Sequence, residues 1–244
     1  MKFWTLIALL CWLPAAAQAE DMRAYRNQTR KLVREGKHAE ALERMLWFHD
    51  NALDHDPGMT GVRLSFALSD WNRLADDYPP AGIALLEMRD RTTKRLLEDG
   101  GDFQLFQEAA AINRTLEDDA GTVHLFEQME KSYPQKAPRY WIVAKDYVIA
   151  AKRYDLAGRY MKDLDADYRR VKQMYDLNLK LSEDPKFGAD HKNYTERTFT
   201  NSVLQLIEVA LATDRREDAE SIQQQALAVR DDAKIRKAVP PNVK

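Results

Sequence analysis

Apolar residues recur every three or four positions along most of the chain, which is the spacing that places them on one face of an α-helix. In the segment 22–35, for example, Tyr25, Leu32 and Val33 share a face. Glycines, prolines and clustered aspartates interrupt the pattern and mark the turns. The pattern predicts helices over residues 22–35, 38–53, 61–74, 81–97, 103–116, 122–131, 138–151, 154–164, 193–213 and 216–230.

One helix boundary is left open by this pattern. The helical period continues without a breaker beyond residue 164, so the helix could extend to residue 181, through Tyr168, Val171, Met174, Leu177 and Leu181. No stretch alternates apolar and polar residues as a half-buried strand does. The fold class is therefore predicted to be all-α.

The predicted helices are joined in pairs by short connections, so each pair forms an antiparallel hairpin. The second helices begin near residues 38, 81, 122, 154 and 216, and the hairpins thus recur about every 32 to 43 residues until the last interval. A helical pair of this period cannot bury both of its faces alone and stacks on its neighbours, which indicates a solenoid.

Two hairpins resemble the tetratricopeptide repeat (TPR). Residues 36–42, Gly-Lys-His-Ala-Glu-Ala-Leu, are similar to the repeat's turn, where a glycine ends the first helix and a small alanine lets the second helix approach. The hairpin 138–164 resembles the repeat at its first aromatic, its large-then-small pair, its second aromatic and its small second-helix position, namely Tyr140, Val143, Ala144, Tyr147 and Ala157, with one extra residue between Tyr147 and Ala157. Residues 61–97 and 193–230 match only loosely.

This resemblance implies a right-handed superhelix of antiparallel hairpins, about ten helices over residues 20–236, with a flexible tail over residues 237–244. In the TPR family the first helices line a concave groove that holds a partner peptide. The corresponding positions here are Arg23, Arg26, Arg30, Phe66, Asp70, Gln107, Trp141 and Lys145. Tyr140 is expected to be buried between its own two helices, and Trp141 to lie against a neighbouring unit or in the groove.

A row of arginines is the most distinctive charged feature. Arg23, Arg26, Arg30 and Arg34 follow at steps of three and four, so they form one stripe on the first helix. Such a stripe could pair with carboxylates of a protein or peptide partner. The alternative is that it is only the solvated face of a terminal helix.

The first 19 residues are predicted to be a signal peptide. Lys2 precedes an apolar run that ends at Pro14, and the small residues Ala17 and Ala19 predict cleavage before Glu20. The mature chain is then exported, to the periplasm if the source is a Gram-negative bacterium and otherwise to the medium. Cys11 lies in the leader, so disulfides and cysteine chemistry are excluded from the mature chain.

Charge and hydropathy exclude two classes of partner. The 244-residue chain has a net charge of -2, without the basic excess of nucleic-acid-binding proteins. After the leader, no apolar run is long enough to cross a membrane.

No catalytic, phosphate-binding or dinucleotide-binding motif is present, so neither an enzyme activity nor a cofactor is predicted. His49, Asp54, His55 and Asp56 carry metal-ligating groups, but His49 and His55 are six residues apart rather than three or four. No metal site is therefore predicted. The principal hypothesis is a non-catalytic scaffold with a peptide-binding groove. The alternatives are an enzyme or enzyme accessory that acts on envelope polymers through acidic groove residues, and a structural oligomer that packs through residues 165–181.

Overall fold

The computed structural model describes residues 21–184 and 186–241, and within them it contains helices and turns but no strand. The all-α prediction is therefore confirmed. The predicted leader and residues 242–244 lie outside the described part. The chain divides into two compact units, Met1–Met88 and Arg89–Lys244, and helix α5 (Pro79–Asp99) passes from one to the other.

The first unit contains two hairpins. Its elements are α1 (Met22–Arg34), α2 (His38–His55), the 3₁₀ turn Pro57–Met59, α3 (Thr60–Val62), the π-helical turn Arg63–Ala67, α4 (Leu68–Asp77) and the start of α5. The helix predicted over residues 61–74 is thus interrupted by a π turn, which hydrophobic periodicity does not reveal. The core of the first unit includes Met22, Tyr25, Phe48, Ala52 and Met59.

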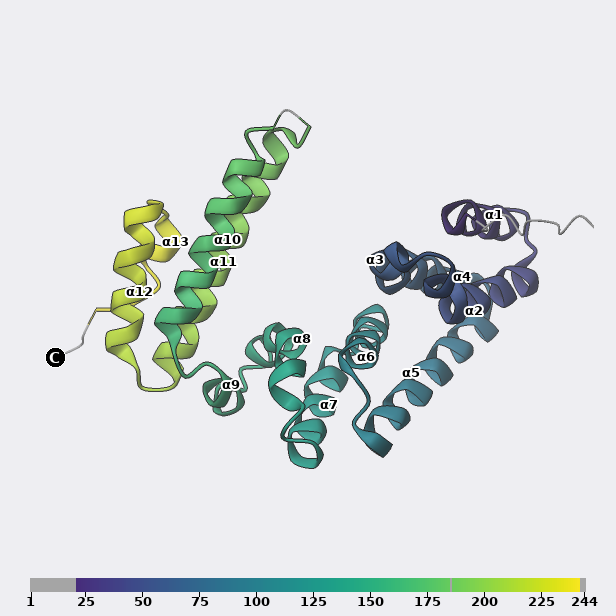
Figure 1. The fold of residues 1–244 in the computed structure, drawn as a ribbon, viewed down its shortest axis with the longest axis horizontal. Helices are drawn as coiled ribbons and strands as arrows, with labels where there is room; N and C mark the ends of the chain where they lie inside the picture. Colours follow the sequence, from purple (N-terminus) through teal and green to yellow (C-terminus); the bar gives the residue numbers. More distant parts are fainter. Residues whose placement is uncertain (1–20, 185, 242–244) are drawn as a thin grey trace, which may run out of the picture. The chain divides into compact units, whose positions relative to one another are not determined.

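The second unit contains the remaining helices (Figure 1). They are α6 (Phe103–Thr115), α7 (Asp119–Ser132), α8 (Ala137–Ala150), α9 (Tyr154–Tyr160), α10 (Leu164–Leu181), α11 (Gly188–Ala212), α12 (Arg216–Val229) and α13 (Ala233–Arg236). One continuous core runs from Leu96 to Ile235, and Ala238 and Val239 of the predicted tail pack partly against it.

The possibility that one helix continues from residue 154 to residue 181 is wrong. Helix α9 ends at Tyr160, and α10 begins after Asp163, whose side chain accepts a hydrogen bond of 2.8 Å from the Ala166 amide. This N-cap satisfies an amide that would otherwise have no partner at the start of α10.

Four hairpin turns have the same backbone geometry. Each has one residue in the left-handed conformation, with φ between 57° and 74°: Gly36, Glu117, Lys152 and Asp214. In each, the next amide bonds back to a carbonyl five residues earlier, at 3.0 Å from Lys37 to Leu32, 2.8 Å from Asp118 to Asn113, 3.0 Å from Arg153 to Val148 and 2.8 Å from Arg215 to Ala210. This bond is the helix-ending Schellman arrangement.

The four turns also set a common register for the side chains around them. Five residues after the left-handed residue comes a fully buried small side chain: Ala41, Thr122, Ala157 and Ala219. Eleven residues before the left-handed residue of each turn come Tyr25, Phe106, Trp141 and Val203, respectively. Of these four side chains, Tyr25, Phe106 and Val203 are buried, whereas Trp141 is half-buried.

Candidate functional site

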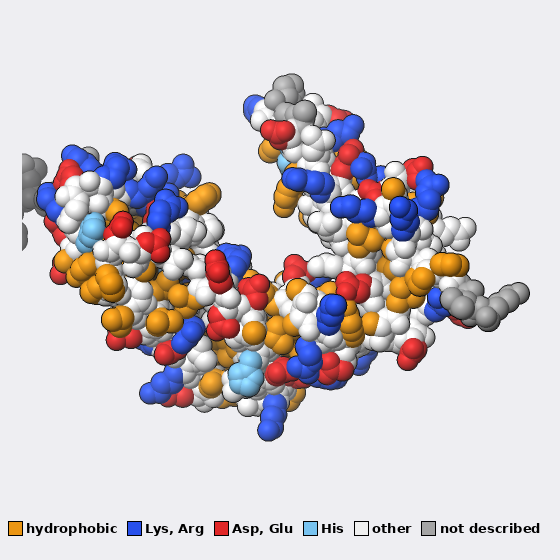
Figure 2. Space-filling model, turned by 180° about the vertical axis from the view of Figure 1, so that it is seen from behind, with side chains coloured by type: hydrophobic (Ala, Val, Ile, Leu, Met, Phe, Trp, Pro, Cys, Tyr) orange, Lys and Arg blue, Asp and Glu red, His pale blue; other side chains and the backbone are white. Residues whose placement is uncertain are grey.

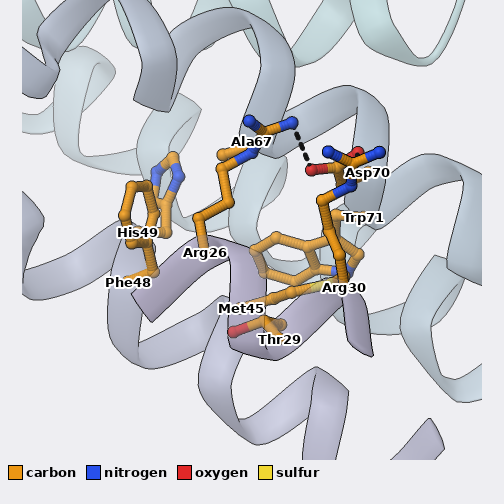
Figure 3. Close-up of a pocket in the computed structure, with 9 residues that line it drawn as sticks. All are labelled: Arg26, Thr29, Arg30, Met45, Phe48, His49, Ala67, Asp70 and Trp71. Atoms are coloured by element: carbon orange, nitrogen blue, oxygen red, sulfur yellow. Dashed lines mark ion pairs between the residues drawn. The ribbon is translucent and has the colours of Figure 1, made fainter. Parts of the chain in front are cut away.

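A cluster of two arginines and one aspartate lies between α1 and α4 of the first unit (Figure 3). Arg26 Nη2 lies 2.5 Å from Asp70 Oδ2, and Arg30 Nε lies 3.9 Å from Asp70 Oδ1. Arg26 and Arg30 are four residues apart on α1, so both side chains reach the same side of the helix. The Asp70 side chain is only 10% exposed, whereas that of Arg30 is 44% exposed.

A small cavity lies beneath this cluster. Its volume of about 20 Å³ has room for about one water molecule. Apart from the charged cluster, its walls are mostly apolar, and comprise Thr29, Met45, Phe48, His49, Ala67 and Trp71. Because it is this small, the cavity is part of the framework and is not a pocket for an organic ligand.

An open groove of about 270 Å³ adjoins the cluster. Val33, Met45 and Leu74 supply its apolar part, and the charged side chains along it are Arg30, Arg34, Asp70, Arg73 and Asp77. Within the described part of the chain, Arg34 and Arg73 take part in no ion pair. Figure 2 shows Lys and Arg side chains gathered along the α1 edge of this unit.

Phe66 extends the same site with an exposed aromatic ring. Its side chain is 62% exposed, and the Arg26 guanidinium carbon lies 5.5 Å from the centre of its ring. This distance allows a cation–π contact. The structure therefore brings together Arg26, Arg30, Phe66 and Asp70, four of the residues predicted to line a groove, while Arg23 is exposed elsewhere on α1.

A histidine–arginine contact beside the cavity was missed by the sequence analysis. Arg63 Nε donates a 2.6 Å hydrogen bond to the His49 carbonyl, and Arg63 Nη2 lies 3.0 Å from His49 Nε2. A guanidinium can only donate, so Nε2 is the acceptor in this contact. Arg63 opens the π turn, and π turns are frequent at functional sites.

The four residues considered as metal ligands do not converge. His49 faces Arg63, the His55 ring lies 5.3 Å from that of Trp47, and Asp56 Oδ1 accepts a 2.8 Å hydrogen bond from the Gly58 amide. Among the described residues, no group of three metal-ligating side chains is assembled anywhere.

The other predicted groove residues lie in the second unit. Gln107 is half-buried on α6, and Lys145 is half-buried on α8 with Nζ 4.0 Å from the Asp146 carboxylate. Trp141 stacks on Tyr160 of α9 with ring centres 5.0 Å apart, and its ring centre is 5.7 Å from that of Phe126 on α7. Trp141 thus packs against second helices of two hairpins.

Tyr140 is buried, but not between its own two helices. Its ring stacks on that of Phe106 in α6 at 4.8 Å, and its hydroxyl donates to the carbonyls of Gly100 and Gly101. Both glycines have positive φ and directly follow Asp99, the last residue of α5. Burial raises the pKa of the Tyr140 hydroxyl, which therefore remains a donor at neutral pH.

An ion-pair network surrounds the stacked Trp141–Tyr160 pair. Arg159 Nε and Nη2 donate to the two oxygens of Glu130 at 2.9 and 2.7 Å, and the Tyr160 hydroxyl donates to Glu130 Oε1 at 3.0 Å. The hydrogen bonds from Arg159 hold the pKa of Glu130 below its ordinary value. The network holds α9 against α7, so its role is structural.

A second open groove, of about 590 Å³, lies between α11 and residues 230–234. Several polar side chains that line this groove already have partners. Arg230 Nη1 lies 2.7 Å from Glu196 Oε2, and the Thr200 hydroxyl donates to Asp232 Oδ2 at 2.9 Å. Its charges balance, with Asp190, Glu196 and Asp232 against Arg197, Arg230 and Lys234. This groove therefore shows no preference for a ligand of either charge.

No protein-family model matches the chain, and no curated protein matches its sequence. None of the helices described here is both long and apolar enough to cross a membrane.

Proposed function

We propose that this chain is an exported, non-catalytic binding protein whose first unit holds an acidic segment of a peptide or protein in the groove between α1 and α4. The observation that carries the proposal is the contrast between two sets of arginines. Arg26 and Arg30 face the Asp70 carboxylate, whereas Arg34 and Arg73 line an apolar groove without an ion pair within the described residues.

Recognition follows from the chemistry of these two side chains. A guanidinium offers paired N–H donors that match the two oxygens of a carboxylate, and such charge-assisted bonds are about twice as strong as neutral ones. Val33 is half-buried and gives the groove an apolar wall that suits an aliphatic side chain next to that carboxylate, while Met45 and Leu74 are buried beneath it. Asp77, on the same groove, repels a second carboxylate and limits where the ligand's charges can lie.

The proposed architecture is a TPR-like right-handed superhelix. Two observations support it. Four hairpins share the same turn geometry, and each turn is followed by a buried small residue. In addition, residues 36–42 resemble the turn of the repeat. The proposed export rests on the predicted leader, and the absence of cysteine after Cys11 is compatible with an oxidising compartment.

The test is binding of a labelled peptide that carries a leucine between two glutamates, measured by fluorescence anisotropy on the chain that begins at Glu20. Matched peptides replace both glutamates with glutamine or lysine. We expect the acidic peptide alone to bind, with an affinity that falls as salt is raised.

The variant Arg34→Gln/Arg73→Gln should weaken this binding at least about tenfold, because a hydrogen bond to a charged group contributes about 1.5–3 kcal/mol and 1.4 kcal/mol is a factor of ten. The control Arg95→Gln/Arg197→Gln removes two exposed arginines of the second unit and should bind as the parent does. Equal binding of the glutamate and glutamine peptides would overturn the proposal.

A further inference from the structure

Helix α10 carries a row of exposed apolar side chains. Met174, Leu177 and Leu181 are 55%, 51% and 41% exposed, and their spacing of three and four residues places them on one face. The opposite face is occupied, since Tyr168 and Tyr175 are buried in the core. Beyond the helix end, Phe187 is also exposed, at 46%. Contiguous apolar surface of this kind marks interaction sites, whereas single exposed residues do not.

The row ends in opposite charges at equal distances. Arg170 lies one turn before Met174, and Asp184 lies about one turn after Leu181. Leu177 is the midpoint in the sequence, seven residues from each of these charges, and Asp184 stands in the turn that follows the last helical residue, Leu181. Such a row is complementary to its own antiparallel copy, because rotation about Leu177 exchanges the two charged ends.

We propose that this face of α10 is the interface between two copies of the chain, packed antiparallel about a two-fold axis at Leu177. In a two-fold interface each contact occurs twice. Arg170 of each copy therefore meets Asp184 of the other, while the Leu177 side chains meet at the axis. The inference is independent of the peptide groove.

The charged groups are available for these contacts. Arg170 pairs with Asp167 of its own helix at 2.5 Å, but its side chain is 68% exposed, so water competes for the guanidinium and this pair is weak. Asp184 Oδ1 accepts the Lys186 amide at 2.9 Å, which leaves Oδ2 for a partner.

Charge also favours a second copy over a lipid surface. Around the hairpin end, Lys180 and Lys186 are matched by Glu183 and Asp184, so there is no basic excess to attract anionic headgroups. One helix pair is a small interface. We therefore expect a reversible dimer with a dissociation constant in the micromolar range.

The test is sedimentation velocity of the chain that begins at Glu20, over a series of micromolar concentrations. The parent should shift from monomer to dimer, and Leu177→Glu, checked for helicity by circular dichroism, should remain monomeric. Arg170→Glu and Asp184→Lys should each weaken the dimer by about tenfold or more, since each places like charges opposite one another twice.

A mixture of the two charge variants provides the sharper test. One Arg170→Glu chain and one Asp184→Lys chain restore both opposite-charge contacts, so the mixture should form heterodimers that neither variant forms alone. Arg169→Glu, a reversal on the same helix but off the row, should dimerise as the parent does. A parent that stays monomeric, with or without binding to phosphatidylglycerol vesicles, would overturn the proposal, and so would a mixture no more associated than its components.

Discussion

Glu130 shows how a single side chain joins three elements. It stands on α7 and accepts hydrogen bonds from Arg159 and Tyr160 on α9, while the Tyr160 ring supports Trp141 of α8. Because Arg159 holds the Glu130 pKa below its ordinary value, the ionised carboxylate is more favourable in the folded chain than in the unfolded one.

The Glu130→Gln variant should therefore show a stability loss that depends on pH. A lowered carboxyl pKa contributes stability that is fully present above the unfolded pKa, near 4.5, and that disappears as the pH falls through the folded pKa. The variant should be less stable than the parent at neutral pH, and the gap between them should close below about pH 4.5. Urea midpoints at several pH values measure it.

Glu183→Gln is the matched control for this effect, because Glu183 is exposed and its side chain makes no ion pair in the part of the chain described. Its urea midpoint should follow that of the parent at every pH. A gap for Glu130→Gln that stayed constant down to acid pH would contradict the assigned role of Arg159.

Individual contacts were less predictable from the sequence than burial. The repeat resemblance predicted that Tyr140 is buried between its own two helices. It is buried, but its ring stacks on Phe106 and its hydroxyl donates to the carbonyl of Gly100, forty residues earlier. Arg26, Arg30 and Asp70 were predicted as groove-lining residues and lie in one ion-pair cluster, which the shared helix face of Arg26 and Arg30 allows. The contact between His49 and Arg63 depends on a π turn, for which the sequence carries no periodic signal.

At the scale of elements, the hairpin turns depend on small buried residues. Ala219 lies five residues after the left-handed Asp214 and is fully buried at the start of α12, where α11 packs against it. A larger side chain there has no space without moving one helix away from the other.

Ala219→Leu should therefore destabilise the chain by about 1–3 kcal/mol, the usual range for overpacking a core. Ala228→Leu makes the same change at an exposed position of the same helix and should alter stability by less than about 0.5 kcal/mol. Urea unfolding followed by circular dichroism compares the two. Equal losses would mean that the α11–α12 contact does not require a small residue.

Most helices were predicted to within a few residues because their apolar faces are long and regular. The error between α9 and α10 occurs where polar capping decides the boundary. Asp163, followed by Asp165 and Asp167, is an N-terminal capping signal that outweighs the unbroken apolar period between α9 and α10. The short helix α13 begins in the same way, with Asp232 accepting the Lys234 amide at 2.8 Å.

At the scale of the whole molecule, the chain folds as two units joined through α5, and each has its own buried side chains. The first unit is the smaller, and smaller units bury a smaller share of their surface and are less stable. The denaturant dependence of unfolding also scales with the surface exposed. We therefore expect two unfolding transitions. The transition of the first unit should occur at the lower urea concentration and should be the broader of the two.

Tryptophan placement makes this prediction measurable in the chain that begins at Glu20. Trp47 and Trp71 lie in the first unit and Trp141 in the second. Fluorescence of Trp141→Phe then reports the first unit alone, and that of Trp47→Phe/Trp71→Phe reports the second. Trp71 is buried and donates a 2.8 Å hydrogen bond to the Ala81 carbonyl, so Trp47→Phe/Trp71→Phe is expected to destabilise the first unit. The fluorescence of this variant reports the second unit, whose contacts are unchanged. Coincident midpoints and slopes in the two variants would instead mean that α5 couples both units into one cooperative transition, as in short repeat arrays whose neighbours stabilise one another.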